Sequence, residues 1–182
     1  MCGQPRDDRG AAATDVIRIV VPYAGAAGKT RLGAGRKELS LAMLGDVLAA
    51  ATSVGRTWVV SPDPVEGADW IRDPGGGQGA AVEAALREIG PGPVLVVNSD
   101  LPSVTADDLY TLHDAIPERG IAIAPASDGT TNALGLSDAT LFLPLYGPGS
   151  AARFRAHAEH AVDVVRPGLR DDVDTPADLV SS

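Results

Sequence analysis

The sequence predicts an α/β protein: a single domain with a mostly parallel central sheet that is covered by helices on both faces. Short runs of aliphatic and β-branched residues alternate at a steady pace with longer segments of helical periodicity. Several of these runs are apolar at every position, which is typical of strands buried on both faces. The length of 182 residues, with 45% hydrophobic residues, is sufficient for one domain with a substantial core.

The first half of the chain begins with a predicted buried strand at Val16–Pro22 and a glycine- and alanine-rich loop at Tyr23–Gly35. A helix is predicted over Lys37–Ala51, because its apolar residues recur every three or four positions. The other elements expected in this half are a strand at Thr57–Val60, a turn at Ser61–Pro64, a short strand at Ala68–Arg72, a turn at Asp73–Gly79 and a helix at Ala80–Ile89.

The second half is predicted to begin with a strand at Val94–Val97, which follows Pro93 and is too short for a helix. A helix is expected over Thr105–Ile116, with Asp107 and Asp108 in the first turn, where the macrodipole favours acidic residues. The later expected elements are a strand at Ile121–Pro125, a polar turn at Asp128–Asn132, an apolar run at Ala133–Leu136, a short strand or extended segment at Leu141–Tyr146, a helix at Ala151–His160, a strand at Ala161–Val165, an acidic turn at Asp171–Asp174 and a short helix from Thr175.

The charge balance excludes two classes of partner. The chain has 24 acidic and 15 basic residues, for a net charge of −9. A protein that neutralises many phosphates needs a basic face, so neither nucleic acid nor an anionic membrane is an expected partner. No stretch is apolar over about 18 residues, and the start of the chain has no signal-peptide pattern, so we expect a cytoplasmic protein. Residues 1–14 are expected to form a disordered leader and residues 15–182 the domain.

Asp100 is the first candidate functional residue, because it comes where the Val94–Val97 strand should end. In open α/β sheets, ligands bind beyond the carboxyl ends of parallel strands, and a carboxylate there can hold a metal ion. The alternative is that Asp100 caps the following helix. Ser103 and Thr105 are nearer candidates for that cap, so we favour the metal interpretation.

The glycine-rich loop after the first strand is the second candidate. Its small residues let the backbone approach a ligand closely, and Lys29 and Arg31 supply positive charge for phosphates. The loop is not a P-loop, because the first glycine of G-x-x-x-x-G-K-[ST] would fall on Tyr23. An ordinary flexible loop is the alternative, but it does not explain why one of the chain's two lysines lies here.

Three further polar clusters become informative only if the fold brings them together. Asp171–Asp174 could share a magnesium ion with Asp100, or be a solvated turn or a helix N-cap. Gly129–Asn132 and Tyr146–Ser150 place small polar residues in predicted turns, and the second precedes a helix whose free N–H groups can bind an anion. For both, an ordinary turn with a helix cap is the alternative.

Taken in order, these segments resemble a family: the guanylyltransferases that activate 2-phospholactate or phosphoenolpyruvate in the biosynthesis of coenzyme F-420. The resemblance covers about Ile17 to Leu179. The motifs that carry it are Lys29-Thr30-Arg31-Leu32, Met43-Leu44-Gly45-Asp46-Val47-Leu48, Asp100-Leu101-Pro102, Gly129-Thr130-Thr131-Asn132-Ala133-Leu134, Tyr146-Gly147-Pro148-Gly149-Ser150 and Asp172-Val173-Asp174-Thr175-Pro176-Ala177-Asp178-Leu179.

The resemblance implies a Rossmann-like nucleotidyltransferase fold, akin to that of molybdenum-cofactor guanylyltransferases, and transfer of GMP from GTP to the phosphate of the acceptor with release of pyrophosphate. It implies that Lys29 and Arg31 bind the triphosphate, and that Asp100 and Asp174, with help from Asp172, hold Mg²⁺. With Lys29, Arg31 and Asp100 as the catalytic set, the expected nucleotide-binding residues also include Pro22, Tyr23, Ala24, Ser61, Asp63 and Gln78, and the expected acceptor-binding residues are Thr131, Asn132, Gly147 and Ser150.

The chain departs from the family pattern at two places. Many members have lysine where this chain has Ala24, and members tend to have L-N-x-A where it has Gln78-Gly79-Ala80-Ala81. The first departure removes a charge from the nucleotide loop. The second bears on base recognition, for which Gln78 is a candidate.

The composition is typical of a GC-rich genome, and for such a source the resemblance implies phosphoenolpyruvate as acceptor, with 2-phospho-L-lactate as the alternative. We expect a monomer or homodimer and a partner enzyme that consumes the unstable activated product. The alternatives are another small nucleotidyltransferase, acting on a sugar phosphate or a molybdopterin-type acceptor, and a nucleotide-binding relic without activity. Intact acidic and hydroxyl positions argue against the relic.

Overall fold

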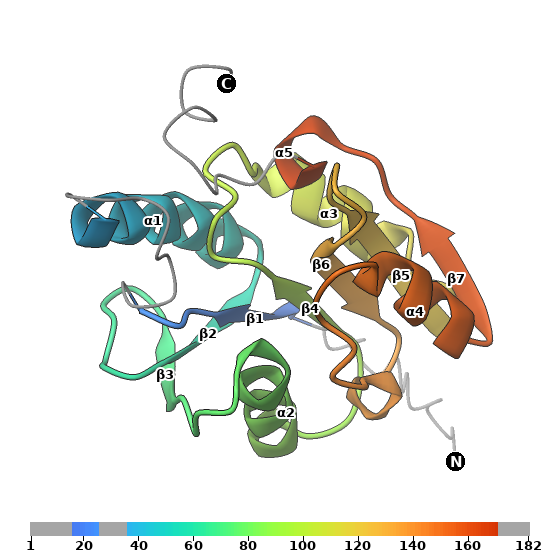
Figure 1. The fold of residues 1–182 in the computed structure, drawn as a ribbon, viewed down its shortest axis with the longest axis horizontal. Helices are drawn as coiled ribbons and strands as arrows, with labels where there is room; N and C mark the ends of the chain where they lie inside the picture. Colours follow the sequence, from blue (N-terminus) through green and yellow to red (C-terminus); the bar gives the residue numbers. More distant parts are fainter. Residues whose placement is uncertain (1–15, 26–35, 171–182) are drawn as a thin grey trace, which may run out of the picture.

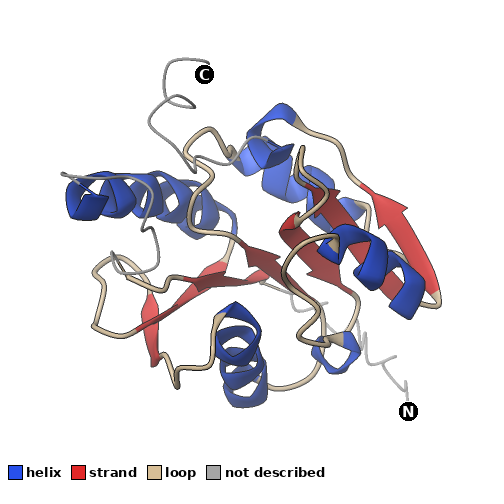
Figure 2. Cartoon of the chain, in the orientation of Figure 1, coloured by secondary structure: helices blue, strands red, loops and turns tan. Residues whose placement is uncertain are grey.

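The computed structural model describes residues 16–25 and 36–170, and within them seven strands form one sheet with helices on both faces (Figures 1 and 2). The strand order is β3-β2-β1-β4-β6-β5-β7. Strand β6 runs antiparallel to both of its neighbours, β4 and β5, and every other neighbouring pair is parallel. The predicted α/β fold with a mostly parallel sheet is confirmed.

Strands and helices follow one another in the predicted order for most of the chain. The strands are β1 (Arg18–Pro22), β2 (Arg56–Ser61), β3 (Asp69–Arg72), β4 (Val94–Val97), β5 (Gly120–Pro125), β6 (Thr131–Leu136) and β7 (His160–Asp163). The helices are α1 (Arg36–Val54), α2 (Gln78–Ile89), α3 (Ala106–Asp114), the 3₁₀ turn η3 (Ala139–Leu141), α4 (Ser150–His157) and the short α5 (Pro167–Arg170).

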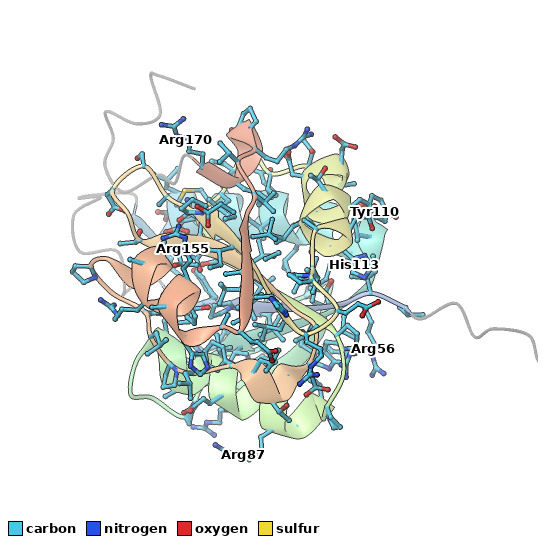
Figure 3. All side chains as sticks on the ribbon, turned by 90° about the vertical axis from the view of Figure 1, so that its right-hand side faces the viewer. Arg56, Arg87, Tyr110, His113, Arg155 and Arg170 are labelled. Atoms are coloured by element: carbon cyan, nitrogen blue, oxygen red, sulfur yellow. The ribbon has the colours of Figure 1, made fainter. Side chains whose placement is uncertain are left out.

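The helices cover the two faces of the sheet in two groups (Figure 2). Side chains of α1, α3 and α5 pack in one buried cluster with alternate residues of the strands, and side chains of α2 and α4 pack in a second cluster on the other face. Aliphatic residues and alanine fill most of both clusters, while Phe142, Tyr146 and Phe154 form a group of ring contacts in the second. Arg87 of α2 and Tyr110 of α3 extend outward from the helices (Figure 3).

Two expected boundaries are wrong, and each has a local cause. The turn before β6 ends at Thr130, because Thr131 and Asn132 already pair in the sheet. Helix α4 ends at His157, and the residues from His160 pair in parallel with β5 instead of extending the helix. For Leu141–Tyr146, expected as a short strand or an extended segment, the strand is excluded: η3 ends at Leu141, Phe142 is extended, and the residues after it have no place in the sheet.

Several predictions concern segments that lie outside the described residues: the leader, the acidic turn at 171–174 and the terminal helix. Among the described residues, no helix combines the length and the hydropathy that a membrane span requires.

The directions of three neighbouring strands determine where polar residues gather. Strands β1 and β4 are parallel, with Ile19 opposite Leu95, so their carboxyl ends lie at the same edge of the sheet. Because β6 runs in the opposite direction, its first residues lie at that edge too, and Asn98 N–H donates to the Asn132 carbonyl over 2.9 Å. The order of strands also reverses between β1 and β4, which is the place where open α/β sheets bind ligands.

Candidate functional site

A pocket with a volume of about 160 Å³ lies at this edge, between the ends of β1 and β4 and the start of α2. It is lined by polar side chains, small residues and main chain from four segments that are far apart in the sequence. The lining residues are Pro22, Tyr23, Ala24, Gly25, Ser40, Asp73, Gly77, Gln78, Ala81, Asn98, Ser99 and Asp100. Of the sequence-predicted nucleotide residues, Pro22, Tyr23, Ala24, Gln78 and Asp100 are thus brought together.

Tyr23 forms one wall of the pocket and is held from both of its ends. Its N–H donates to the Val60 carbonyl over 2.8 Å, which extends the pairing of β1 with β2 by one residue. Its hydroxyl lies 3.3 Å from the Ser40 Oγ in α1, and both side chains are buried. This contact fixes the chain where it leaves the sheet, while Ala24, the next residue, is exposed.

Gln78, Asn98 and Thr131 form a chain of hydrogen bonds across three elements. Gln78 Nε2 donates to Asn98 Oδ1 over 2.6 Å, and Asn98 Nδ2 donates to the Thr131 carbonyl over 3.1 Å. Gln78 is the first residue of α2, Asn98 directly follows β4, and Thr131 begins β6. The polar lining of the pocket is therefore connected to the start of β6.

Asp100 lies on the pocket and does not cap the helix that follows it. Thr105 is the N-cap of α3: its Oγ1 accepts from Asp108 N–H, and the Asp108 carboxylate accepts from Thr105 N–H. The alternative role for Asp100 is therefore excluded. Asp73 is the second carboxylate on the pocket wall, and its Oδ1 accepts from Gly75 N–H over 2.8 Å.

A complete metal site is not present in the described part of the chain: within residues 16–25 and 36–170, no three His, Cys, Asp or Glu side chains are grouped to hold an ion. Asp172 and Asp174, the ligands expected to join Asp100, lie outside the described residues, as do Lys29 and Arg31.

The predicted acceptor residues Thr131 and Ser150 lie in contact. Ser150 Oγ donates to Thr131 Oγ1 over 3.0 Å, and both residues are buried. Two turns hold them there: Ser150 N–H donates to the Gly147 carbonyl, and Ala151 N–H donates to the Gly129 carbonyl. Gly147 has a φ of +108°, which a residue with a Cβ rarely adopts. The structure thus joins two motifs that are separated by about twenty residues.

Asn132 has a different environment from Thr131. It is 1% exposed, and its Nδ2 donates to the carbonyls of Leu169 and Arg170, each over 3.1 Å. These carbonyls are at the end of α5. Asn132 therefore holds the chain at the point where it continues, in sequence, into Asp171 and Asp172.

Helix α5 is also fixed by an ion pair to α3. Arg166 Nε donates to Asp108 Oδ1 over 2.8 Å, and its Nη2 pairs with Asp107. Burial raises the pKa of the Asp108 carboxyl, but hydrogen bonds from Arg166 and Thr105 outweigh it and lower the pKa below its ordinary value. Gly168 is needed for the close approach, because a Cβ there would lie 2.3 Å from Asp108 Oδ2 and 2.6 Å from the Ser103 carbonyl.

Ser61 and Asp63 are not among the residues that line the pocket. Ser61 is buried, and its Oγ donates to the Asp63 carbonyl over 2.6 Å. The Ser61 carbonyl accepts from Asp73 N–H over 3.0 Å. This turn places Asp73 at the pocket.

Comparison with known proteins identifies the family. Residues 17–165 match the family described as "Guanylyl transferase CofC like". The chain belongs to this family. It is a nucleotidyltransferase.

Individual relatives agree with the family assignment. The chain is 39% identical over 163 residues to the phosphoenolpyruvate guanylyltransferase of Sphaerobacter thermophilus, with 79% of this chain and 78% of the relative covered. It is 40% identical over 159 residues to the phosphoenolpyruvate guanylyltransferase of Roseiflexus castenholzii, with 80% of this chain and 74% of the relative covered.

Solved structures with the same fold have lower sequence identity. A putative nucleotide-diphospho-sugar transferase from Desulfovibrio desulfuricans has a TM-score of 0.68 at 20% identity, covering 90% of this chain and 83% of its own. The 2-C-methyl-D-erythritol 4-phosphate cytidylyltransferase of Thermus thermophilus has a TM-score of 0.67 at 19% identity, covering 91% and 96%. These similarities confirm the Rossmann-like nucleotidyltransferase fold.

One departure from the CofC-like pattern has a structural explanation. A Cβ at Gly79 would lie 2.6 Å from Pro144 Cβ and 3.2 Å from Pro144 Cα. The segment after η3 therefore packs directly on the backbone of α2 and leaves no room for the asparagine that family members tend to have. The adjacent Gln78 is the polar side chain that this helix offers to the pocket instead.

Four residues with polar side chains in the pocket of this CofC-like protein were not predicted as site residues from the sequence: Ser40, Asp73, Asn98 and Ser99. Asn98 and Ser99 directly precede Asp100 beyond β4, so the argument that selected Asp100 could have selected them. Asp73 and Ser40 have no comparable signal, because their position depends on the turn at Ser61 and on the packing of α1.

Proposed function

We propose that the protein transfers GMP from GTP to the phosphate of phosphoenolpyruvate, with release of pyrophosphate, as a step in the biosynthesis of coenzyme F-420. The observation that carries this proposal is the connection of the pocket to the Thr131–Ser150 pair through Asn98. Two substrate sites at one sheet edge are what a group transfer needs. The names of the relatives from Sphaerobacter and Roseiflexus support this choice of acceptor.

For the nucleotide, we assign the pocket. Pro22, Tyr23 and Ala24 would lie along it on one side and Gln78 on the other, with Lys29 and Arg31 binding the triphosphate. Ser61 and Asp63 would support the site through their turn, which positions Asp73.

We assign the acceptor site to the two turns that directly precede β6 and α4. Thr131 and Ser150, whose buried hydroxyl groups are bonded to each other at these turns, would bind a phosphate or carboxylate oxygen of the acceptor, and Gly147 would shape the turn beside them. Asn132 would contribute indirectly, by holding the end of α5 against β6.

The residues present fit a magnesium ion. Mg²⁺ is usually bound by one or two carboxylates together with substrate phosphates, and Asp100 places a carboxylate on the wall of the pocket. Asp174, assisted by Asp172, would complete the protein ligands. When bound, Mg²⁺ neutralises charge on the triphosphate and orients it.

In the proposed reaction, an oxygen of the acceptor phosphate attacks the α-phosphorus of GTP in line. The new bond joins that oxygen to the α-phosphorus, the bond from the α-phosphorus to the β-bridging oxygen breaks, and pyrophosphate leaves. The acceptor oxygen is already deprotonated at neutral pH, so no general base is required. The protein contributes positioning and charge stabilisation.

The proposal is tested by following pyrophosphate release from GTP and Mg²⁺ with each acceptor in turn. We expect release with phosphoenolpyruvate, less with 2-phospho-L-lactate, and none without acceptor. Release only with a sugar phosphate or a molybdopterin-type acceptor would identify another nucleotidyltransferase. Binding of GTP without release for any acceptor would identify a non-catalytic relic, and preference for ATP would refute the guanine assignment.

The product would be a reactive mixed anhydride of two phosphates. We therefore propose that a partner enzyme consumes it. We further propose that both enzymes act in the cytoplasm and that the protein is a monomer or homodimer.

A further inference from the structure

The hydrogen-bond chain through Asn98 fixes the orientation of two carboxamide groups. The Thr131 carbonyl can only accept a hydrogen bond, so it requires the NH₂ group of Asn98, and Nδ2 lies 3.1 Å away. The oxygen of Asn98 then points to Gln78. Only the NH₂ group of Gln78 can donate to it, and Nε2 lies 2.6 Å away.

The backbone of Asn98 is held as firmly as its side chain. Its N–H donates to the Asn132 carbonyl over 2.9 Å, which continues the pairing of β4 with β6 beyond Val97. Asn98 is thus bonded to β6 through both its backbone and its side chain, and a rotation of its carboxamide would break the bond from Nδ2 to the Thr131 carbonyl. The NH₂ group of Gln78 is used in the bond to Asn98. The other end of the same amide, Gln78 Oε1, is therefore the atom that can accept a hydrogen bond from a ligand in the pocket, which both residues line.

We propose that Gln78 selects guanine over adenine with this oxygen and that Asn98 is the positioning residue that keeps it an acceptor. The inference rests on the proposed function, in which GTP occupies the pocket. Guanine carries N–H donors at N1 and at its exocyclic 2-amino group, both of which an amide oxygen accepts. Adenine has a lone pair at N1, which the same oxygen repels.

A free glutamine would discriminate poorly, because its amide can rotate and present either an oxygen or an NH₂ group. When the amide cannot rotate, the contact becomes selective, since adenine would then face an oxygen to which it cannot donate from N1. The fixed orientation depends on the Thr131 carbonyl, so the start of β6 determines which base edge the pocket accepts.

The inference is tested by equilibrium binding of GTP and ATP, each with Mg²⁺ and without acceptor, to the wild type, Gln78→Leu, Asn98→Ala and the double variant. The wild type is expected to prefer GTP. Each single variant should reduce the ratio of the two dissociation constants by about tenfold or more. Gln78→Leu removes the contact with the base, and Asn98→Ala leaves the Gln78 amide free to rotate and accept either base. The ratio for the double variant should be no lower than the ratio for either single variant, since the two residues act as one unit.

Arg87→Gln is the control, because Arg87 extends outward from the same helix (Figure 3), and its ratio should match that of the wild type. An unchanged ratio in Gln78→Leu, or single effects that multiply in the double variant, would overturn the inference. If Asn98→Ala does not fold, the Gln78→Leu variant alone tests the inference. We expect it to fold, since the side chain of Gln78 is only half-buried at the start of α2. A protein that prefers GTP but transfers nothing to phosphoenolpyruvate would contradict the proposed function and leave this inference intact.

Discussion

Replacement of Asp108 by alanine should destabilise the fold through the loss of two separate contacts. The side chain of Asp108 is 5% exposed, accepts hydrogen bonds from Thr105 and pairs with Arg166. Loss of its part in the cap of α3 costs about 1 kcal/mol. Loss of the charge-assisted bond costs about 1.5 kcal/mol, the lower end of its range, because the side chain of Arg166 is 35% exposed.

The expected sum of about 2.5 kcal/mol corresponds to a fall in Tm of about 5–10 °C for a chain of this size. Thermal unfolding followed by circular dichroism at pH 7 measures it. Asp107→Ala is the matched control: it removes the other carboxylate that pairs with Arg166, but that side chain is 78% exposed, so the Tm should change little.

The difference in Tm between the wild type and Asp108→Ala should depend on pH in a defined direction. The pKa of Asp108 is lowered in the folded protein, from an ordinary value of 3.8. Its stabilisation is therefore present above about pH 4 and is lost as the pH falls through the folded pKa. The gap in Tm between wild type and Asp108→Ala should narrow in acid. A gap that widens in acid, or an equal loss in Asp107→Ala, would refute the assigned ion pair.

Three other substitutions test the site. Asp100→Asn should lower kcat by about 10²-fold or more with an unchanged circular dichroism spectrum, and near-normal turnover would exclude a metal role. Ser150→Ala should raise the KM for phosphoenolpyruvate about tenfold in steady-state kinetics. A change in the KM for GTP alone would show that Ser150 acts on the nucleotide and not on the acceptor. Gly79→Ala should destabilise the protein by about 1–3 kcal/mol in urea unfolding, because of Pro144, and wild-type stability would show that this segment yields easily.

The sequence was sufficient to predict most of the sheet because its strands are short apolar runs between helices of clear periodicity. It did not reveal the direction of β6, since a run such as Thr131–Leu136 is buried at every position whichever way it pairs. The same limit explains the error at the turn before it. Thr131 and Asn132 are polar, which predicts a turn, but hydrogen bonds to Ser150 and to the end of α5 satisfy them inside the sheet.

The candidate site was predictable where a residue's position follows from the strand that precedes it. Pro22 and Asp100 each come after a parallel strand, and the structure brings both to one pocket. The same argument places Asn98 at this edge but does not give its role, because its contacts are to Gln78 and Thr131, twenty and 33 residues away. Such contacts depend on which strands are neighbours, and a single sequence does not specify the order of strands.

The reversed direction of β6 explains how the two proposed substrate sites can lie at one edge of the sheet. A strand of six residues spans about 20 Å. If β6 were parallel to β4, its beginning, Thr131, would lie about that far from the pocket, at the opposite edge. Because β6 is antiparallel, Thr131 lies beside the end of β4, where Asn98 binds it and Ser150 joins it. The proposed transfer requires the acceptor phosphate and the nucleotide to meet, and this one reversed strand allows it.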